Sequence, residues 1–158
     1  MSARPDSNRT IRKEINEYLR AQNTPLLAAH DAHKQWMAKL PDIYEQVRNG
    51  QGAPAAAGAR LLGKHYGSIF RHSIVDLEKI KPPQAATRCQ EYMLRWLNCL
   101  VRASDALTNA PEDGRDGQYL RDSRDYMDDA QYALKPLVEI RQRLHQAANS
   151  PPAAKEKP

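Results

Sequence analysis

The sequence predicts an all-α protein, an antiparallel helical bundle of three long helices plus shorter N-terminal helices. Hydrophobic residues make up 41% of the 158-residue chain and aromatic residues only 6%. The core must therefore consist largely of Leu, Ile, Met and Ala, a mixture that favours helices. Three long segments repeat their apolar residues every three or four positions, and most prolines fall between segments, where helices end.

The three long helices are predicted over residues 54–80, 83–109 and 116–148. At about 100° per residue, each segment gathers its apolar side chains in one arc and places charged side chains opposite. These apolar residues include Tyr66, Phe70 and Leu77 in the first segment, Met93, Trp96 and Leu100 in the second, and Tyr119, Ala130 and Leu137 in the third. Helices of this length, about 40 Å, are typical of bundles.

Shorter helices are predicted to precede them and to supply the fourth layer of the bundle. Their expected ranges are 8–22, 24–39 and 41–49. Thr24 and Pro25 match an N-cap followed by proline at the first helical position. Pro41 and Pro136 fall inside otherwise helical patterns, where proline costs about 3 kcal/mol, so each is expected to break or kink its helix.

Length and polarity predict a single domain over residues 1–149 and a disordered tail over 150–158. Cys89 and Cys99 lie ten residues apart in one predicted helix, about 15 Å along its axis, and cannot bridge each other. No stretch approaches the roughly 18 apolar residues of a membrane span, and the polar first residues do not resemble a signal peptide. We therefore expect a cytoplasmic protein with no membrane association.

Two histidines, His30 and His33, form the candidate site. Projection of 24–39 as a helix places both on its apolar face, on adjacent turns. They can in principle bind one divalent metal, with further ligands such as Asp122 or Asp129 from a facing helix. The alternatives are hydrogen-bonded structural histidines and a polar pocket for a small ligand. If both are buried, desolvation is expected to lower their pKa, whereas a carboxylate partner would raise it.

Small residues recur at intervals of four in the segment 54–80, at Ala59, Gly63 and Gly67. Each glycine costs a helix up to about 1 kcal/mol relative to alanine, so a packing reason is expected. We predict close approach of a neighbouring helix, and we predict that Gly63→Leu destabilises the fold by more than about 1 kcal/mol.

Charge and motif content leave few function classes. The net charge of +5 raises the question of nucleic acid, but basic residues are interleaved with acidic ones and form no run, so such binding is not expected. No nucleophile, phosphate-loop or zinc motif is present, which favours a non-enzyme. We expect a protein-interaction or regulatory module that binds a protein partner or a second copy of itself. The alternatives are a metal- or small-ligand-binding bundle centred on His30 and His33, possibly catalytic, and a nucleic-acid-associated basic protein.

Overall fold

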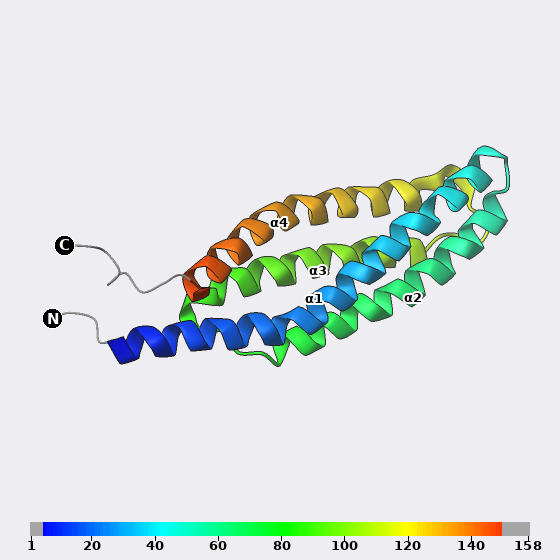
Figure 1. Ribbon diagram of the computed structural model, residues 1–158. Helices are drawn as coiled ribbons and strands as arrows, with labels where there is room; N and C mark the ends of the chain where they lie inside the picture. The colour runs from blue at the N-terminus through cyan, green and yellow to red at the C-terminus, as the bar shows by residue number, and fades with distance from the viewer. Residues whose placement is uncertain (1–4, 150–158) are drawn as a thin grey trace.

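The computed structural model describes residues 5–149, which form one antiparallel bundle (Figure 1). Its helices are α1 (Pro5–Arg48), α2 (Gly52–Glu78), α3 (Thr87–Thr108) and α4 (Gln118–Asn149), with single 3₁₀ turns at Gln84–Ala86 and Arg115–Gly117. The described residues contain no strand, so the predicted all-α bundle is confirmed. The predicted disordered tail, 150–158, lies outside the described residues.

The four helices follow one another around the bundle, and consecutive helices pack side by side (Figure 1). The contacts of α3 with α4, of α2 with α3 and of α1 with α2 are extensive, whereas α1 and α4 touch much less. Three seams of the bundle are thus closely packed, and the fourth, between the first and last helices, is more open.

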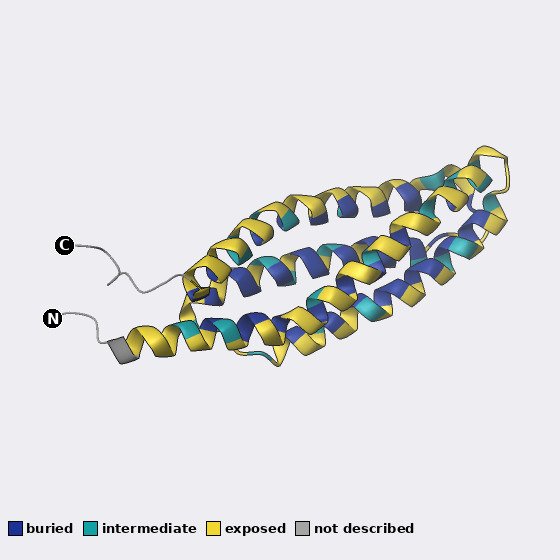
Figure 2. Ribbon diagram, in the orientation of Figure 1, coloured by how far each residue is buried: buried dark blue, intermediate teal, exposed yellow. Residues whose placement is uncertain are grey.

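The core lies along the bundle axis, where every helix turns its apolar stripe inward (Figure 2). Its largest fully buried apolar side chains are Trp36, Trp96, Tyr66, Phe70, Leu77, Met93, Leu97, Leu100, Leu107 and Leu137. Trp36 of α1 packs edge-on against Tyr66 of α2, with ring centres 6.2 Å apart, and lies 6.4 Å from the ring of Phe70. These contacts join the two long apolar stripes that the sequence pattern predicts.

The prediction of three short N-terminal helices is wrong, because residues 5–48 form one continuous helix with Pro25 and Pro41 inside it. The same apolar stripe continues on both sides of each proline, from Ile15 through Trp36 to Ile43, and every one of these side chains is buried. Burial along the whole stripe offsets the local cost of about 3 kcal/mol for a proline inside a helix. Tertiary packing therefore outweighs the local tendency of proline to end a helix.

The three long helices differ from their predicted ranges mainly at the ends. α3 begins at Thr87, four residues later than predicted, because Pro82 and Pro83 are followed by a 3₁₀ turn. α4 runs to Asn149 without interruption, so Pro136 does not break it as expected. Within residues 5–149, no helix combines the length and apolarity that crossing a membrane requires.

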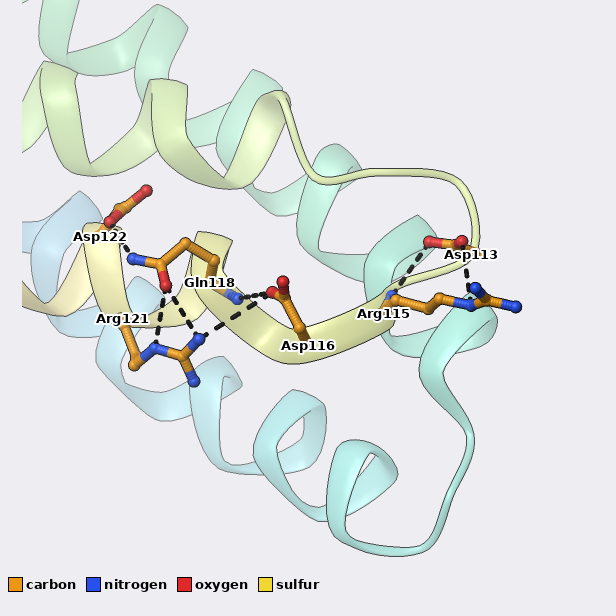
Figure 3. Close-up of polar contacts among 6 residues, drawn as sticks. All are labelled: Asp113, Arg115, Asp116, Gln118, Arg121 and Asp122. Atoms are coloured by element: carbon orange, nitrogen blue, oxygen red, sulfur yellow. Dashed lines mark hydrogen bonds and ion pairs between the residues drawn. The ribbon is translucent and has the colours of Figure 1, made fainter.

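Two loops meet at the end of the bundle where α1 turns into α2 and α3 turns into α4. Gly114 has a φ of +63°, and a side chain there would collide with the backbone carbonyl of Gly52, so only glycine fits this approach. Asp116, also at positive φ, accepts a hydrogen bond of 2.9 Å from the backbone N–H of Gln118 and so caps the start of α4 (Figure 3). This end of the bundle is therefore fixed by a close backbone approach and by side-chain hydrogen bonds to the backbone.

The predicted close approach at Gly63 is confirmed. A Cβ atom at this position would lie 2.7 Å from the backbone nitrogen of Thr108 and would also meet the carbonyl oxygen of Ser104, both on α3. The hydroxyls of Ser104 and Thr108 donate back to carbonyls of their own helix, to Leu100 and Ser104 respectively. The polar atoms at this crossing are therefore satisfied within α3, which lets the two backbones approach.

Candidate functional site

The open seam between α1 and α4 contains a groove with a volume of about 350 Å³. We call it the α1–α4 groove, and its lining residues are His33, Met37, Leu40, Pro41 and Tyr44 of α1 with Leu120, Ser123, Arg124, Met127, Asp128 and Gln131 of α4. It exists because each helix directs the middle of its apolar stripe at its better-packed neighbour and leaves only the edge of that stripe for this seam.

The walls of the α1–α4 groove are apolar and the rim is polar. Leu120 and Met127 are buried, Leu40 and Tyr44 are half-buried, and Met37 leaves 46% of its surface exposed. Methionine side chains are unbranched and polarisable. Met37 and Met127 can therefore adjust their conformations to different bound groups. Apolar walls with a few polar groups at the edge are the usual composition of a binding site.

His33 is the one predicted site residue that lines this groove. It is half-buried, and burial lowers the pKa of its imidazole, with the neighbouring charge of His30 lowering it further. This is the direction expected from desolvation without a carboxylate partner. The expectation that His30 is buried on the same apolar face is wrong: His30 is exposed, because it lies at the edge of the stripe on the open seam.

The lowered pKa of His33 predicts a pH dependence of stability. Because the folded state binds a proton at this site less readily than the unfolded state, the free energy of unfolding should fall as pH drops through the unfolded value of about 6.5 and level off below the folded pKa. Urea unfolding of the parent protein and of His33→Gln between pH 7.5 and 5 measures this. We expect the parent to lose more stability over that range, and equal losses would contradict a desolvated His33.

The predicted metal ligands are not brought together. Asp129 lies on the α3 side of α4, in a surface pocket with Arg95 and Cys99, and Asp122 accepts a hydrogen bond of 2.7 Å from Gln118 Nε2 near the start of α4 (Figure 3). Both are exposed. The described residues hold no group of three or more His, Cys, Asp or Glu side chains that could share a metal ion. Divalent metal binding stays a prediction, which metal analysis of untagged protein tests.

A buried polar network closes one end of the α1–α4 seam. Gln22 of α1, fully buried, accepts a hydrogen bond from the guanidinium of Arg141 on α4. The Gln22 side-chain nitrogen donates to the Tyr18 hydroxyl at 2.8 Å and lies 3.5 Å from the sulfur of Cys89 on α3. Burial is the main reason why the pKa of Cys89 is raised and that of Arg141 is lowered.

The network continues to the last turn of α2. The Tyr18 hydroxyl donates to Gln90 Oε1 at 2.6 Å, and Gln90 Nε2 donates to the backbone carbonyl oxygens of Leu77 and Ile80 at 2.9 and 3.3 Å. One chain of hydrogen bonds therefore contacts all four helices, and it gives a second donor to the Leu77 carbonyl oxygen, which also accepts from the backbone N–H of Ile80 at 3.0 Å.

Sequence reasoning missed both the α1–α4 groove and this network. One signal was available: Gln22 falls within the apolar arc of its helix, where a polar side chain needs a partner. Asp128 rather than Asp129 lines the groove, a difference of one position that rotates the side chain by about 100°. Which edge of α4 faces α1 follows from the packing of the bundle and not from the pattern of α4 alone.

Comparisons of the chain with protein-family models, with curated proteins and with solved structures find no match.

Proposed function

We propose that this protein is an interaction module whose α1–α4 groove accepts an amphipathic helix of a protein partner. One observation carries the proposal: three seams of the bundle are closely packed, while the fourth leaves a groove with apolar walls open to the surface. A helix laid into such a groove would cover apolar side chains, as helix-in-groove recognition does. We place this function in the cytoplasm, as expected from the sequence.

The dimensions of the groove suit a short helix. Its α1 wall runs from His33 to Tyr44, about 17 Å at 1.5 Å per residue, which matches roughly three helical turns. A partner helix of that length offers apolar anchors at positions i, i+3 or i+4, and i+7. Met37, with 46% of its surface exposed, is the residue that such anchors would cover first.

The charges around the groove favour an acidic partner helix. Helical spacing, together with the ion pair of Arg121 and Asp116 at 3.9 Å, places the following charged residues on the outer edges of the seam: the basic Lys34, Arg48, Arg121, Arg124 and Lys135, and the acidic Glu45, Asp116 and Asp128. Basic residues predominate, in keeping with the net charge of +5 for the chain. Complementary charge at a rim mainly accelerates association and selects among partners.

The test uses synthetic helical peptides of about 18 residues with one apolar face and a glutamate-rich opposite face. Fluorescence anisotropy should show that this peptide binds the parent protein, and that a lysine-rich peptide with the same apolar face binds at least tenfold more weakly. Met37→Glu should weaken binding of the acidic peptide at least tenfold. Val75→Glu on α2, where 50% of the valine surface is exposed, is the matched control and should bind like the parent.

Three results would overturn an acidic partner helix as the occupant of the groove. Equal affinities of the acidic and lysine-rich peptides, or equal affinities of Met37→Glu and the parent, would mean that the groove does not recognise an acidic helix. A concentration-dependent dimer in sedimentation analysis that Met37→Glu dissociates would identify a second copy of the chain as the occupant instead. Both measurements use variants at exposed positions, so neither substitution is expected to unfold the protein.

A further inference from the structure

A second pocket lies on the opposite edge of α4, over its seam with α3. We call it the Tyr92–Tyr132 pocket; its lining residues are Tyr92, Arg95 and Cys99 of α3 with Asp129, Tyr132, Ala133 and Pro136 of α4. Its volume is about 470 Å³, within the range of about 300–1,000 Å³ typical of small-molecule sites. It shares no residue with the α1–α4 groove, so a ligand here would be independent of a partner helix there.

The aromatic part of the pocket is unusually accessible. Tyr132 exposes 87% of its surface, the largest fraction among the exposed large hydrophobic residues, and Tyr92 is half-buried on the opposite wall. Pro136 follows Tyr132 by one helical turn and extends the apolar wall. An aromatic ring entering the pocket therefore finds Tyr132 largely uncovered by the side chains of residues 5–149, and stacking on an exposed tyrosine ring accepts any flat heterocycle.

The cationic part of the pocket is Arg95, and Arg88, which lies outside the lining of the pocket, contacts the same Tyr92 ring. The guanidinium carbon of Arg95 lies 4.9 Å from the centre of the Tyr92 ring and that of Arg88 lies 5.9 Å from it, one turn after and one turn before the tyrosine. Among residues 5–149 neither guanidinium has a hydrogen-bonded or ion-paired acceptor. Each guanidinium is attracted to the electron-rich ring while its N–H donors have no acceptor within the described part of the chain, which suits Arg95 to a phosphate.

We propose that the Tyr92–Tyr132 pocket binds a nucleoside monophosphate. The base stacks on Tyr132, the phosphate accepts hydrogen bonds from Arg95, and the Asp129 carboxylate accepts one from a ribose hydroxyl, while Arg88 adds positive charge beside the Tyr92 ring. The phosphate takes the α3 side of the pocket because Asp129 on the α4 side would repel it. This ligand combines a flat ring, an anion and a hydroxyl donor, and the pocket offers a partner for each.

The charges beyond the pocket distinguish a mononucleotide from a nucleic acid strand. Asp125 and Asp122 lie one and two turns, respectively, from Asp129 along the same edge of α4, toward its N-terminus. Successive phosphates of a strand that left the pocket in this direction would meet these carboxylates and be repelled. The acidic edge of α4 therefore disfavours a row of phosphates, whereas Arg95 on α3 can accept a single one.

Cys99 provides a direct readout of occupancy. It lines the pocket and is half-buried, whereas Cys89 is fully buried. Iodoacetamide, an uncharged reagent, should therefore alkylate one thiol in the folded protein: the Cys99 thiolate displaces iodide and forms a thioether, which intact-mass spectrometry detects. Burial, followed by the charge of Asp129, raises the pKa of Cys99, so the reaction is run near pH 8.5. AMP and UMP should slow it at least fivefold.

The affinity itself is measured by NMR titration of the full chain with AMP, adenosine and inorganic phosphate. We expect AMP to bind at least tenfold more tightly than either fragment. Tyr132→Ala and Arg95→Gln should each lower the AMP affinity about tenfold. Leu61→Ala, at a residue with 72% of its surface exposed on α2, and Arg20→Gln on the exposed side of α1 are the matched controls and should leave it unchanged.

Several outcomes would overturn the assignment. If inorganic phosphate binds as tightly as AMP, the pocket recognises only an anion. If adenosine binds as tightly as AMP, the pocket recognises only an aromatic ring system. Parent-like affinity in Tyr132→Ala or Arg95→Gln would place the nucleotide elsewhere. A 5′-phosphorylated oligonucleotide that binds more tightly than AMP and protects Cys99 would assign the site to nucleic acid.

Discussion

Replacing Gly63 with leucine is expected to lower the free energy of unfolding by about 3 kcal/mol, although leucine is the better helix former. The reason is that a Cβ at this position would lie 2.7 Å from the backbone nitrogen of Thr108. A flexible side chain can move aside, but the backbone of α3 cannot yield without separating from α2. Urea unfolding monitored by circular dichroism measures the change. A variant as stable as the parent would show that the two helices do not approach this closely.

The same helix offers a matched control at Gly58. A Cβ there would contact only Ile43 Cγ1, at an ordinary 4.0 Å, so Gly58→Ala should gain helix propensity and stabilise the fold by about 0.5–1 kcal/mol. Gly63→Ala should instead destabilise it, because even one methyl group meets the α3 backbone. If the same Gly→Ala substitution changes stability in opposite directions at Gly58 and Gly63, close packing and not helix propensity determines the effect at Gly63.

The parts of the fold that the sequence predicts are those in which local pattern and tertiary packing agree. The apolar arcs around Phe70, Met93 and Leu137 identify their helices because a buried stripe must recur every three or four residues. Gly63 is predictable for a related reason: a costly residue on an apolar face needs a compensating contact. In each case the residue type and its position in the helical repeat are sufficient to predict its place in the fold.

The parts that the sequence did not predict depend on energies shared among distant residues. Pro25 is a local stop signal, but the single helix α1 is maintained by burial of side chains on both sides of it, such as Leu19 and Trp36. His30 and Asp129 were expected to face a common site, yet His30 is exposed at the edge of α1 and Asp129 lies on the α3 side of α4. The rotation of each helix about its axis decides such placements, and it is set by the whole bundle.

The buried network should behave as one unit, and its disruption is the second large effect we expect. Gln22→Leu removes the acceptor of Arg141 and the partner of Tyr18 and Cys89, so it should lower the free energy of unfolding by about 2 kcal/mol. Arg141→Met should cost less, because Gln22 keeps the Tyr18 hydroxyl and the Cys89 thiol as partners.

The double variant Gln22→Leu with Arg141→Met distinguishes a coupled network from two independent contacts. Replacing both partners with apolar side chains leaves no guanidinium desolvated without its acceptor, so the double variant should be at least 1 kcal/mol more stable than the sum of the single effects predicts. Urea unfolding of the parent and all three variants completes the cycle. Additive effects would mean that Arg141 reaches solvent when Gln22 is absent, and the end of the α1–α4 seam would then be held by apolar packing alone.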